Sequence, residues 1–299
     1  MTGRGAVGLG ATALVAALLL GGCGTSRSGD LGLAPTAPPP SAAPTDRPEP
    51  TPTRAAAPTP PATNRPPGPS TTASTGTRRL DPVTVELWYV RAGLLVPTRR
   101  TRPGTVATSR LALTELAAGP SPAEAATGMI TLLPAGVEVT RIADGMATLR
   151  VPAVGDPATR RLREAQVVWT LTQFPSVRQV RLDDAAPVDR ADYADLLPPI
   201  VVTGPIPGER VSAPLVVTGT ATVFEATVSV RVLDAAGRQV ATGFGTASCG
   251  SGCRGGYRVV VGWRTVREQK GTVEVYEVSA ENGERIHTMA VPVVLAPRD

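Results

Sequence analysis

The chain has 299 residues, a hydrophobic fraction of 42% and a formal net charge of +5, which predict one or two folded domains with apolar cores. Its 31 prolines are too many for one globular domain and indicate a separate proline-rich segment. A basic chain would ordinarily raise nucleic acid as a partner, but the export signal described next excludes nucleic acid.

The amino terminus has the features of an export signal. Arg4 precedes an apolar run from Ala11 to Leu20, whose length of about ten residues fits a secretory signal peptide and falls short of a spanning helix. Leu20 is followed by Gly21, Gly22 and Cys23, and these four residues resemble the bacterial lipobox. The resemblance implies that residues 1–22 are a lipoprotein signal peptide and that Cys23 carries the lipid, palmitate included. The protein is then extracytoplasmic and lipid-anchored to the cell membrane. The alternative is an ordinary signal peptide with an incidental cysteine.

Residues 23–79 combine the predicted lipid anchor with a segment rich in proline and threonine. The stretch from Ala34 to Pro52 is typical, with proline, threonine and alanine but few large apolar side chains. Such a segment cannot offset the entropy of ordering, so we expect a disordered linker with partly polyproline II conformation. Its expected role is to hold the folded domains away from the membrane.

Residues 80–184 begin with a predicted hairpin and a helix. Apolar residues alternate from Val83 to Val90, as in a strand, and residues 94–99 are expected to pair back against it. A helix capped by Thr108 or Ser109 follows.

The second half of this segment adds a hairpin, a helix and a last strand. Strands are predicted over residues 137–142, 146–151 and 177–182. Asp144-Gly145 is a strong hairpin signal between the first two. Asp156 followed by Pro157 predicts a helix start. That helix is expected to bury Leu162, Ala165, Trp169 and Thr172. The order of elements predicts an α+β domain, with a mostly antiparallel sheet and two helices on one face.

Four motifs in this segment resemble the GerMN domain of bacterial sporulation and germination lipoproteins. In chain order they are Leu116 to Pro120, Leu133 to Gly136, the Asp144-Gly145 hairpin and Thr170 to Val177. Asp183-Asp184 stand where many members have a glycine turn, which affects only the expected loop geometry. GerMN-type folds are similar to small domains that stack edge to edge, so the resemblance leaves a homo-oligomer or a ring assembly open.

Residues 185–198 are predicted to be an acidic interdomain linker, and residues 199–297 an all-β domain. Six or seven strands are expected, over 200–203, 214–219, 227–232, 238–242, 257–261, 272–276 and 289–294. Turn signals such as Asn282-Gly283 separate them. Short strands at this spacing favour an immunoglobulin-like sandwich.

The second segment also resembles a known module. The strand from Pro214 to Ala221, the segment Val223 to Ala226 and the turn at Asn282-Gly283 resemble Gmad2, an immunoglobulin-like domain of spore germination proteins. The two resemblances together imply a noncatalytic cell-envelope lipoprotein of the sporulation or germination type, acting in envelope complex assembly or sensing. One alternative is a lipoprotein whose sandwich binds a cell-wall polymer or glycan. Another is an envelope hydrolase.

The predicted partners are the membrane, through the lipid anchor, and envelope proteins or a wall polymer. Strand edges and exposed apolar side chains, with Trp88 and Trp263 as candidates, are the expected routes to protein contacts.

Few side chains point to chemistry. His287 is the one histidine, and no Gly-x-Ser-x-Gly elbow accompanies it, so a structural role is favoured over catalysis. Glu225 has no carboxylate partner in the sequence and is expected at a strand bend. Cys249 and Cys253 lie close together and predict a disulfide rather than a metal site. The acidic residues of the linker region, Asp183, Asp184, Asp189, Asp192 and Asp195, fit no EF-hand loop. The sequence therefore predicts no catalytic residue, no cofactor and no metal.

Overall fold

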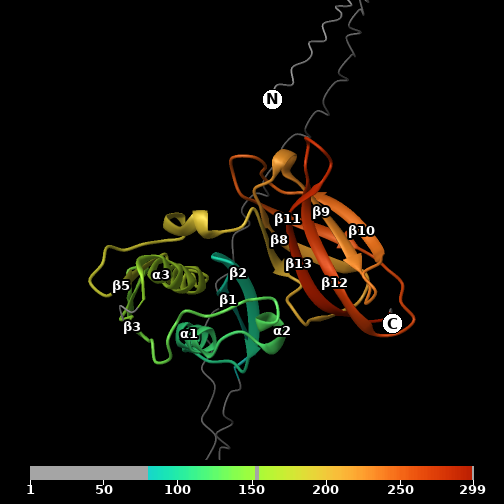
Figure 1. Cartoon of the computed structure of the whole chain (residues 1–299). Helices are drawn as coiled ribbons and strands as arrows, with labels where there is room; N and C mark the ends of the chain where they lie inside the picture. The colour runs from blue at the N-terminus through green and yellow to red at the C-terminus, as the bar shows by residue number, and fades with distance from the viewer. Residues whose placement is uncertain (1–79, 152–154, 298–299) are drawn as a thin grey trace, which may run out of the picture. The chain divides into compact units, whose positions relative to one another are not determined.

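The computed structural model describes residues 80–151 and 155–297. The predictions for residues 1–79, namely the signal peptide, the lipid on Cys23 and the proline-rich linker, lie outside the described residues. The described residues belong to one compact unit that contains two hydrophobic cores. Figure 1 shows the two corresponding domains, a first domain of helices and strands and a second domain built mainly of strands.

The first domain opens with an antiparallel hairpin of β1 (Val83–Arg91) and β2 (Leu94–Arg102), as predicted. The residues of β1 predicted to face inward are largely buried, but Trp88 and Val90 on its other face are buried as well. Trp88 stacks on Trp169 of a helix, with 4.6 Å between the ring centroids. The expectation that Trp88 is an exposed interaction residue is therefore wrong, because helices cover both faces of this strand.

Three helices belong to this domain: α1 (Thr108–Ala118), α2 (Pro122–Ala125) and α3 (Pro157–Leu171). The predicted cap of α1 is wrong, because Ala107 occupies the N-cap position and Thr108 is already helical. The short α2 is absent from the predicted elements, although Ser121 and Glu124 form a capping box at the spacing that defines this motif. The side chain of Asp156 caps α3, as predicted.

The remaining strands form a separate sheet of β3 (Val139–Ala143), β4 (Met146–Leu149) and β5 (Gln179–Leu182). β3 and β4 are antiparallel, and the hairpin between them has positive φ at Asp144 (55°) and Gly145 (83°), as an Asp-Gly turn requires. β5 joins β4 in parallel. The predicted single sheet is thus divided into a two-stranded and a three-stranded part.

Helix α3 presents a polar row to the open edge of β1. Gln166 Nε2 donates to Trp88 O at 2.9 Å, and Trp88 N donates to Thr170 Oγ1 at 3.2 Å. One turn further, Glu86 N donates to Gln173 Oε1 at 2.8 Å. These side chains take the place of a neighbouring strand, because buried backbone groups need hydrogen-bond partners.

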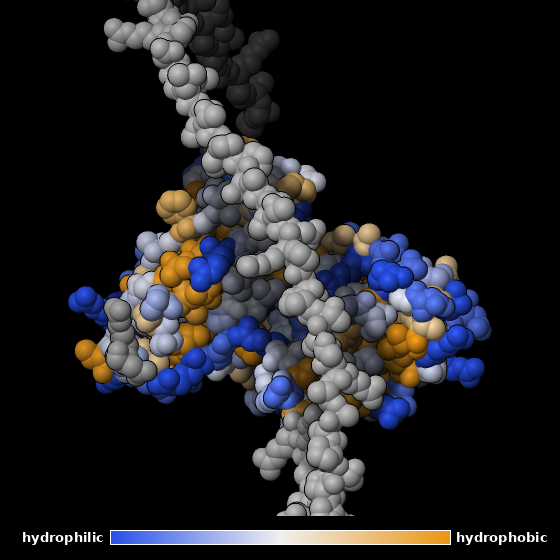
Figure 2. Space-filling model, turned by 180° about the vertical axis from the view of Figure 1, so that it is seen from behind, coloured by the Kyte–Doolittle hydropathy of each residue, from blue (hydrophilic) through white to orange (hydrophobic). Residues whose placement is uncertain are grey.

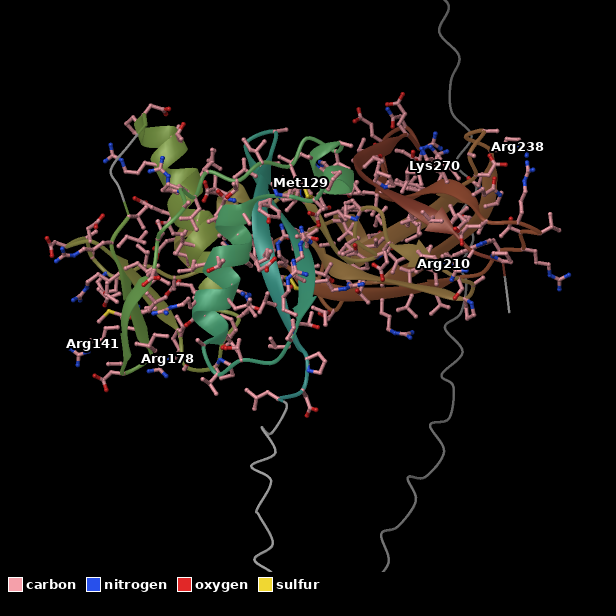
Figure 3. All side chains as sticks on the ribbon, turned by 90° about the horizontal axis from the view of Figure 1, so that it is seen from below. Met129, Arg141, Arg178, Arg210, Arg238 and Lys270 are labelled. Atoms are coloured by element: carbon pink, nitrogen blue, oxygen red, sulfur yellow. A yellow bond between two sulfur atoms is a disulfide. The ribbon has the colours of Figure 1, made fainter. Side chains whose placement is uncertain are left out.

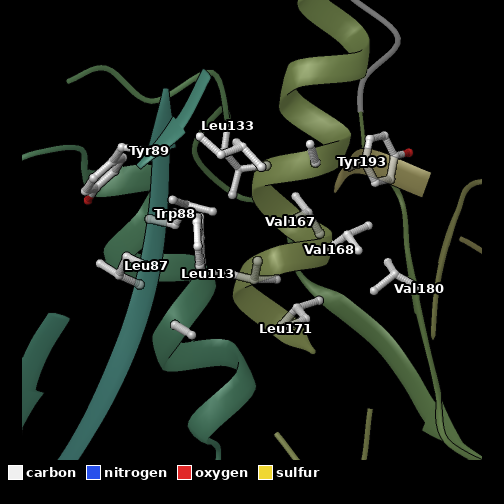
Figure 4. Close-up of a cluster of buried hydrophobic side chains, with 14 of the residues drawn as sticks. Leu87, Trp88, Tyr89, Leu113, Leu133, Val167, Val168, Leu171, Val180 and Tyr193 are labelled. Carbon is white, nitrogen blue, oxygen red and sulfur yellow. The ribbon is translucent and has the colours of Figure 1, made fainter. Parts of the chain in front are cut away.

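The predicted inward face of α3 is correct at Ala165, whereas Leu162, Trp169 and Thr172 are only partly buried, with Leu162 and Trp169 packed against the edge of the first core. The polar row turns the helix so that Val167, Val168 and Leu171 enter the core instead. Figure 4 shows these side chains beside those of β1 and α1.

The second domain is a sandwich of two sheets, as predicted. Its strands are β6 (Ile200–Gly204), β7 (Arg210–Val211), β8 (Leu215–Ala221), β9 (Thr227–Leu233), β10 (Gln239–Thr246), β11 (Gly255–Val261), β12 (Gln269–Val278) and β13 (Arg285–Leu295). One sheet has the order β10-β9-β12-β13-β7, and the other has the order β11-β8-β6. Alternating residues of β8, β9, β11 and β12 are buried between the sheets, and valine dominates this core.

Two short 3-10 helices complete the fold. η1 (Ala191–Leu196) lies in the predicted linker between the domains, and η2 (Phe224–Ala226) lies between β8 and β9. No helix of the described residues is long and apolar enough to cross a membrane. Figure 2 shows a mostly hydrophilic face with apolar side chains gathered in separate patches.

Candidate functional site

Several of the residues singled out from the sequence meet at one end of the second domain. The centre of this corner is η2, where Phe224 is 52% exposed. The backbone of Glu225 adopts the left-handed conformation, with φ of 52°. The following Ala226 has φ of 57°. A left-handed conformation costs roughly 1–2 kcal/mol at a residue that is not glycine. Neighbouring segments must therefore hold this turn in place.

The carboxylate of Glu277 on β12 helps to hold this turn in place. Its Oε1 accepts a hydrogen bond from Phe224 N at 2.8 Å, and its Oε2 lies 2.8 Å from Nδ1 of His287. The side chain of Glu277 is 8% exposed, against 44% for His287. A buried carboxylate needs such partners, because leaving its charge without hydrogen bonds is costly.

His287 lies in β13 at a break in the register between β12 and β13. Its φ of 53° is again left-handed. The extra residue in this strand turns the imidazole toward Glu277, so the pair fixes the irregular backbone.

The disulfide loop packs against the same turn. Cys249 and Cys253 form a disulfide, with 5.8 Å between their Cα atoms. A Cβ atom on Gly250 would lie 3.0 Å from the backbone nitrogen of Ala226, so glycine favours this close approach. Ala247 N also donates to Ala226 O at 2.8 Å. The loop and the turn therefore form one rigid surface.

The chemistry available at this corner is limited. The carboxylate and imidazole are used to hold backbone, and among the described residues no serine or cysteine nucleophile makes a hydrogen bond to His287. Glu225 has no side-chain hydrogen bond or ion pair within the part of the chain that the structure describes. No group of three or more histidine, cysteine or acidic side chains in residues 80–151 and 155–297 could hold a metal ion.

The remaining candidates lie elsewhere. Of the linker aspartates, Asp195 pairs with Arg161, and Asp183 Oδ1 accepts from Val151 N at 3.2 Å. Trp263 is 6% exposed, so the expectation that it is an exposed contact residue is wrong. It follows β11, and its ring packs into the core of the sandwich.

Sequence reasoning missed Glu277 as the central residue of this corner. In β12, buried and less buried residues alternate, and Glu277 shares the buried face with Val273 and Val275. This position in the alternation is the sequence signal that could have identified Glu277 as buried. An acidic residue in such a position indicates a specific partner. The partner itself could not be found from the sequence, because Phe224 is 53 residues away.

Comparison with protein families identifies both domains. Residues 58–183 match Germane, described as sporulation and spore germination, and residues 199–284 match Gmad2, described as the immunoglobulin-like domain of bacterial spore germination. The chain is a tandem of these two domain types. The Germane domain holds the first core, and the Gmad2 domain holds the corner around Phe224. Both families are associated with sporulation and germination, and neither description names a catalytic activity.

The solved structures that resemble the chain do so distantly. One contains the tandem GerMN domains of the sporulation protein GerM from Bacillus subtilis, at 17% identity and a TM-score of 0.32. That match covers 73% of this chain, and this chain covers 62% of that one. A second structure, described as a candidate lipoprotein from Clostridium perfringens, is 15% identical with a TM-score of 0.24, and the match covers 39% of this chain and 93% of that one. A comparison with characterised protein sequences found no match.

Proposed function

We propose that this protein is a noncatalytic lipoprotein of the bacterial cell envelope, anchored to the membrane through Cys23, that takes part in assembling an envelope protein complex. Both domain types belong to sporulation and germination proteins, which supports a role in an envelope process of this kind. The anchor rests on the lipobox resemblance, and two acyl chains would hold the protein on the membrane almost irreversibly.

The exposed ring of Phe224 on its rigid turn carries the proposal. The backbone of this residue is held by Glu277, and the disulfide loop packs beside it. A turn whose backbone is already held loses little backbone entropy when a partner covers it, and exposed aromatic side chains contribute much of the affinity of protein interfaces. Glu277 and His287 hold the backbone at this corner in place, which favours a role in binding a protein partner over a role in catalysis.

The test is crosslinking of the full-length chain in its own membranes, followed by affinity capture and mass spectrometry. Phe244 provides a matched control, since it is also an exposed phenylalanine of the Gmad2 domain (77%) but lies on β10. We expect a defined set of envelope proteins that is lost with Cys23→Ala. We also expect it to fall about fivefold or more with Phe224→Ser and to persist with Phe244→Ser.

Two results would contradict the proposal. Equal losses from Phe224→Ser and Phe244→Ser would remove the role of the rigid turn. Recovery of wall fragments without any protein partner would favour the alternative function, binding of a cell-wall polymer or glycan.

A further inference from the structure

A hollow on the Germane domain with both charged and apolar side chains has features of a binding site that the complex-assembly role does not use. It has a volume of about 420 Å³ and lies where α3 ends. Its walls come from the chain just after the helix and from the residues before η1: Thr172, Phe174, Pro175, Arg178, Asp189 and Arg190. The first four belong to or directly follow the Thr170 to Val177 motif, whose Leu171 and Val177 lie in the first core.

Arg190 is the central cation of this hollow. Its Nε donates to Thr172 Oγ1 at 2.7 Å and its Nη2 donates to Trp169 O at 3.0 Å. The guanidinium also lies over the Trp169 ring, with 4.5 Å to the centroid. These contacts fix its orientation and leave Nη1 without a protein partner among the described residues.

No carboxylate of the described residues forms an ion pair with Arg190. Burial lowers the pKa of its guanidinium, and the nearby charge of Glu86 only partly offsets this effect. A half-buried positive charge that has a carboxylate nearby but no direct ion pair is incompletely compensated in the free protein. An anion that entered the hollow would supply the missing partner.

The rest of the hollow fits an anion attached to a ring or chain. Arg178 adds a second cation without an ion pair among the described residues. Its Nη2 donates to Asp144 O at 3.1 Å, and its exposed side chain lies at the surface of the domain in Figure 3. Asp189 is the one carboxylate of the lining, which also holds the two arginines. Phe174 and Pro175 provide an apolar wall beside the charges.

A second hollow of about 530 Å³ adjoins the first, because Thr172, Gln173 and Arg190 line both. Four threonines belong to its lining: Thr84, Thr98, Thr203 and Thr218. Their hydroxyl groups also have protein partners, because Thr203 and Thr218 bond each other, Thr84 bonds Thr101, and the buried Thr98 donates to Glu124. The arginine within it, Arg99, is already paired with Glu209 at 2.7 Å, and Glu86 is a further acid there. The second hollow therefore offers hydroxyl contacts rather than a free cation.

We propose that the two hollows form one groove that binds an anionic glycan, with its carboxylate or phosphate on Arg190 and Arg178 and its hydroxyl-bearing rings along the threonines. Guanidinium groups bind carboxylates and phosphates through paired, charge-assisted hydrogen bonds. Apolar side chains beside polar ones suit a sugar ring, which has an apolar face and a polar rim. The proposal is independent of the complex-assembly role and of the membrane anchor.

Isothermal titration calorimetry of the full chain in detergent micelles tests the groove with defined probes. The first probe is a hyaluronan tetrasaccharide, which carries carboxylates, and chitotetraose is the neutral comparison. Inorganic phosphate is the anion without a sugar. We expect the hyaluronan tetrasaccharide to bind more tightly than both and to weaken as salt rises from about 50 to 300 mM, because charge interactions at a surface are screened.

Three arginine variants locate the binding. Arg190→Gln and Arg178→Gln should each raise the dissociation constant about fivefold or more. Arg160→Gln is the matched control and should change it less than about twofold, because Arg160 is exposed on the first turn of α3, about 18 Å along the helix from Thr172. Since Arg190 also contacts Trp169, the surface variant Arg178→Gln keeps the test informative if Arg190→Gln does not fold.

Each contrary result overturns a part of the proposal. Equal binding of chitotetraose would exclude the anionic contact, and equal binding of phosphate would exclude the sugar. If Arg160→Gln lowers the affinity as much as Arg178→Gln does, the binding depends on the overall positive charge of the protein and not on the groove. No measurable heat with the tetrasaccharide at millimolar concentration would exclude the groove as a glycan site.

Discussion

At the scale of single residues, Glu277 connects three segments that are distant in the sequence. We predict that Glu277→Ala lowers the free energy of unfolding by about 1–3 kcal/mol, because the buried Phe224 N–H and the imidazole of His287 lose their partner. Glu277→Gln should cost less, since the amide oxygen can still accept from Phe224 N. Urea unfolding followed by tryptophan fluorescence measures both variants.

The control for this prediction is Glu281→Ala. Glu281 is exposed in the turn after β12, and replacing it should change stability by no more than about 0.5 kcal/mol. If Glu277→Ala proves as mild as Glu281→Ala, the turn at Phe224 does not depend on the carboxylate.

At the scale of elements, the side chains of α3 act as the neighbour of an edge strand. Gln166 is fully buried, donates to Trp88 O and accepts from Leu132 N at 2.8 Å. Gln166→Leu keeps the size of the side chain but leaves both backbone groups unpaired. We predict a loss of at least about 2 kcal/mol in the free energy of unfolding. Arg160→Leu, on the exposed side of the same helix, should stay within about 0.5 kcal/mol of the original. A small effect of Gln166→Leu would mean that water replaces the amide.

The elements that the sequence predicts well are those with local signals. Asp144-Gly145 specifies a hairpin and Asp156 specifies a helix start because their effects act within a few residues. The buried face of α3 was predicted less well, since Gln166 and Thr170 find their partners about 80 residues away on β1. The disulfide pair could be chosen from spacing alone. The hold of Glu277 on Phe224 and the groove around Arg190 could not, because both depend on contacts between distant segments.

At the scale of the molecule, the contact of β2 with the segment before β7 links the Germane and Gmad2 domains within one unit. Arg99 Nη2 lies 2.8 and 2.7 Å from the two carboxylate oxygens of Glu209, and its Nη1 donates to Thr203 O at 3.0 Å. The two side chains are 39% and 32% exposed, so water weakens their attraction. A surface pair of this kind contributes up to about 1 kcal/mol.

A double-mutant cycle with Arg99→Met and Glu209→Gln tests whether this pair couples the domains. Since the guanidinium meets both oxygens, we predict a coupling energy of about 0.5–1 kcal/mol in thermal unfolding. The comparison pair is Arg210 and Glu268, both within the Gmad2 domain, more exposed and joined by one contact of 2.7 Å. Its coupling should be nearer about 0.2 kcal/mol. Equal coupling in the two cycles would show that Arg99 and Glu209 attract each other only as surface charges do. The two domains would then be linked without a specific contribution from this ion pair.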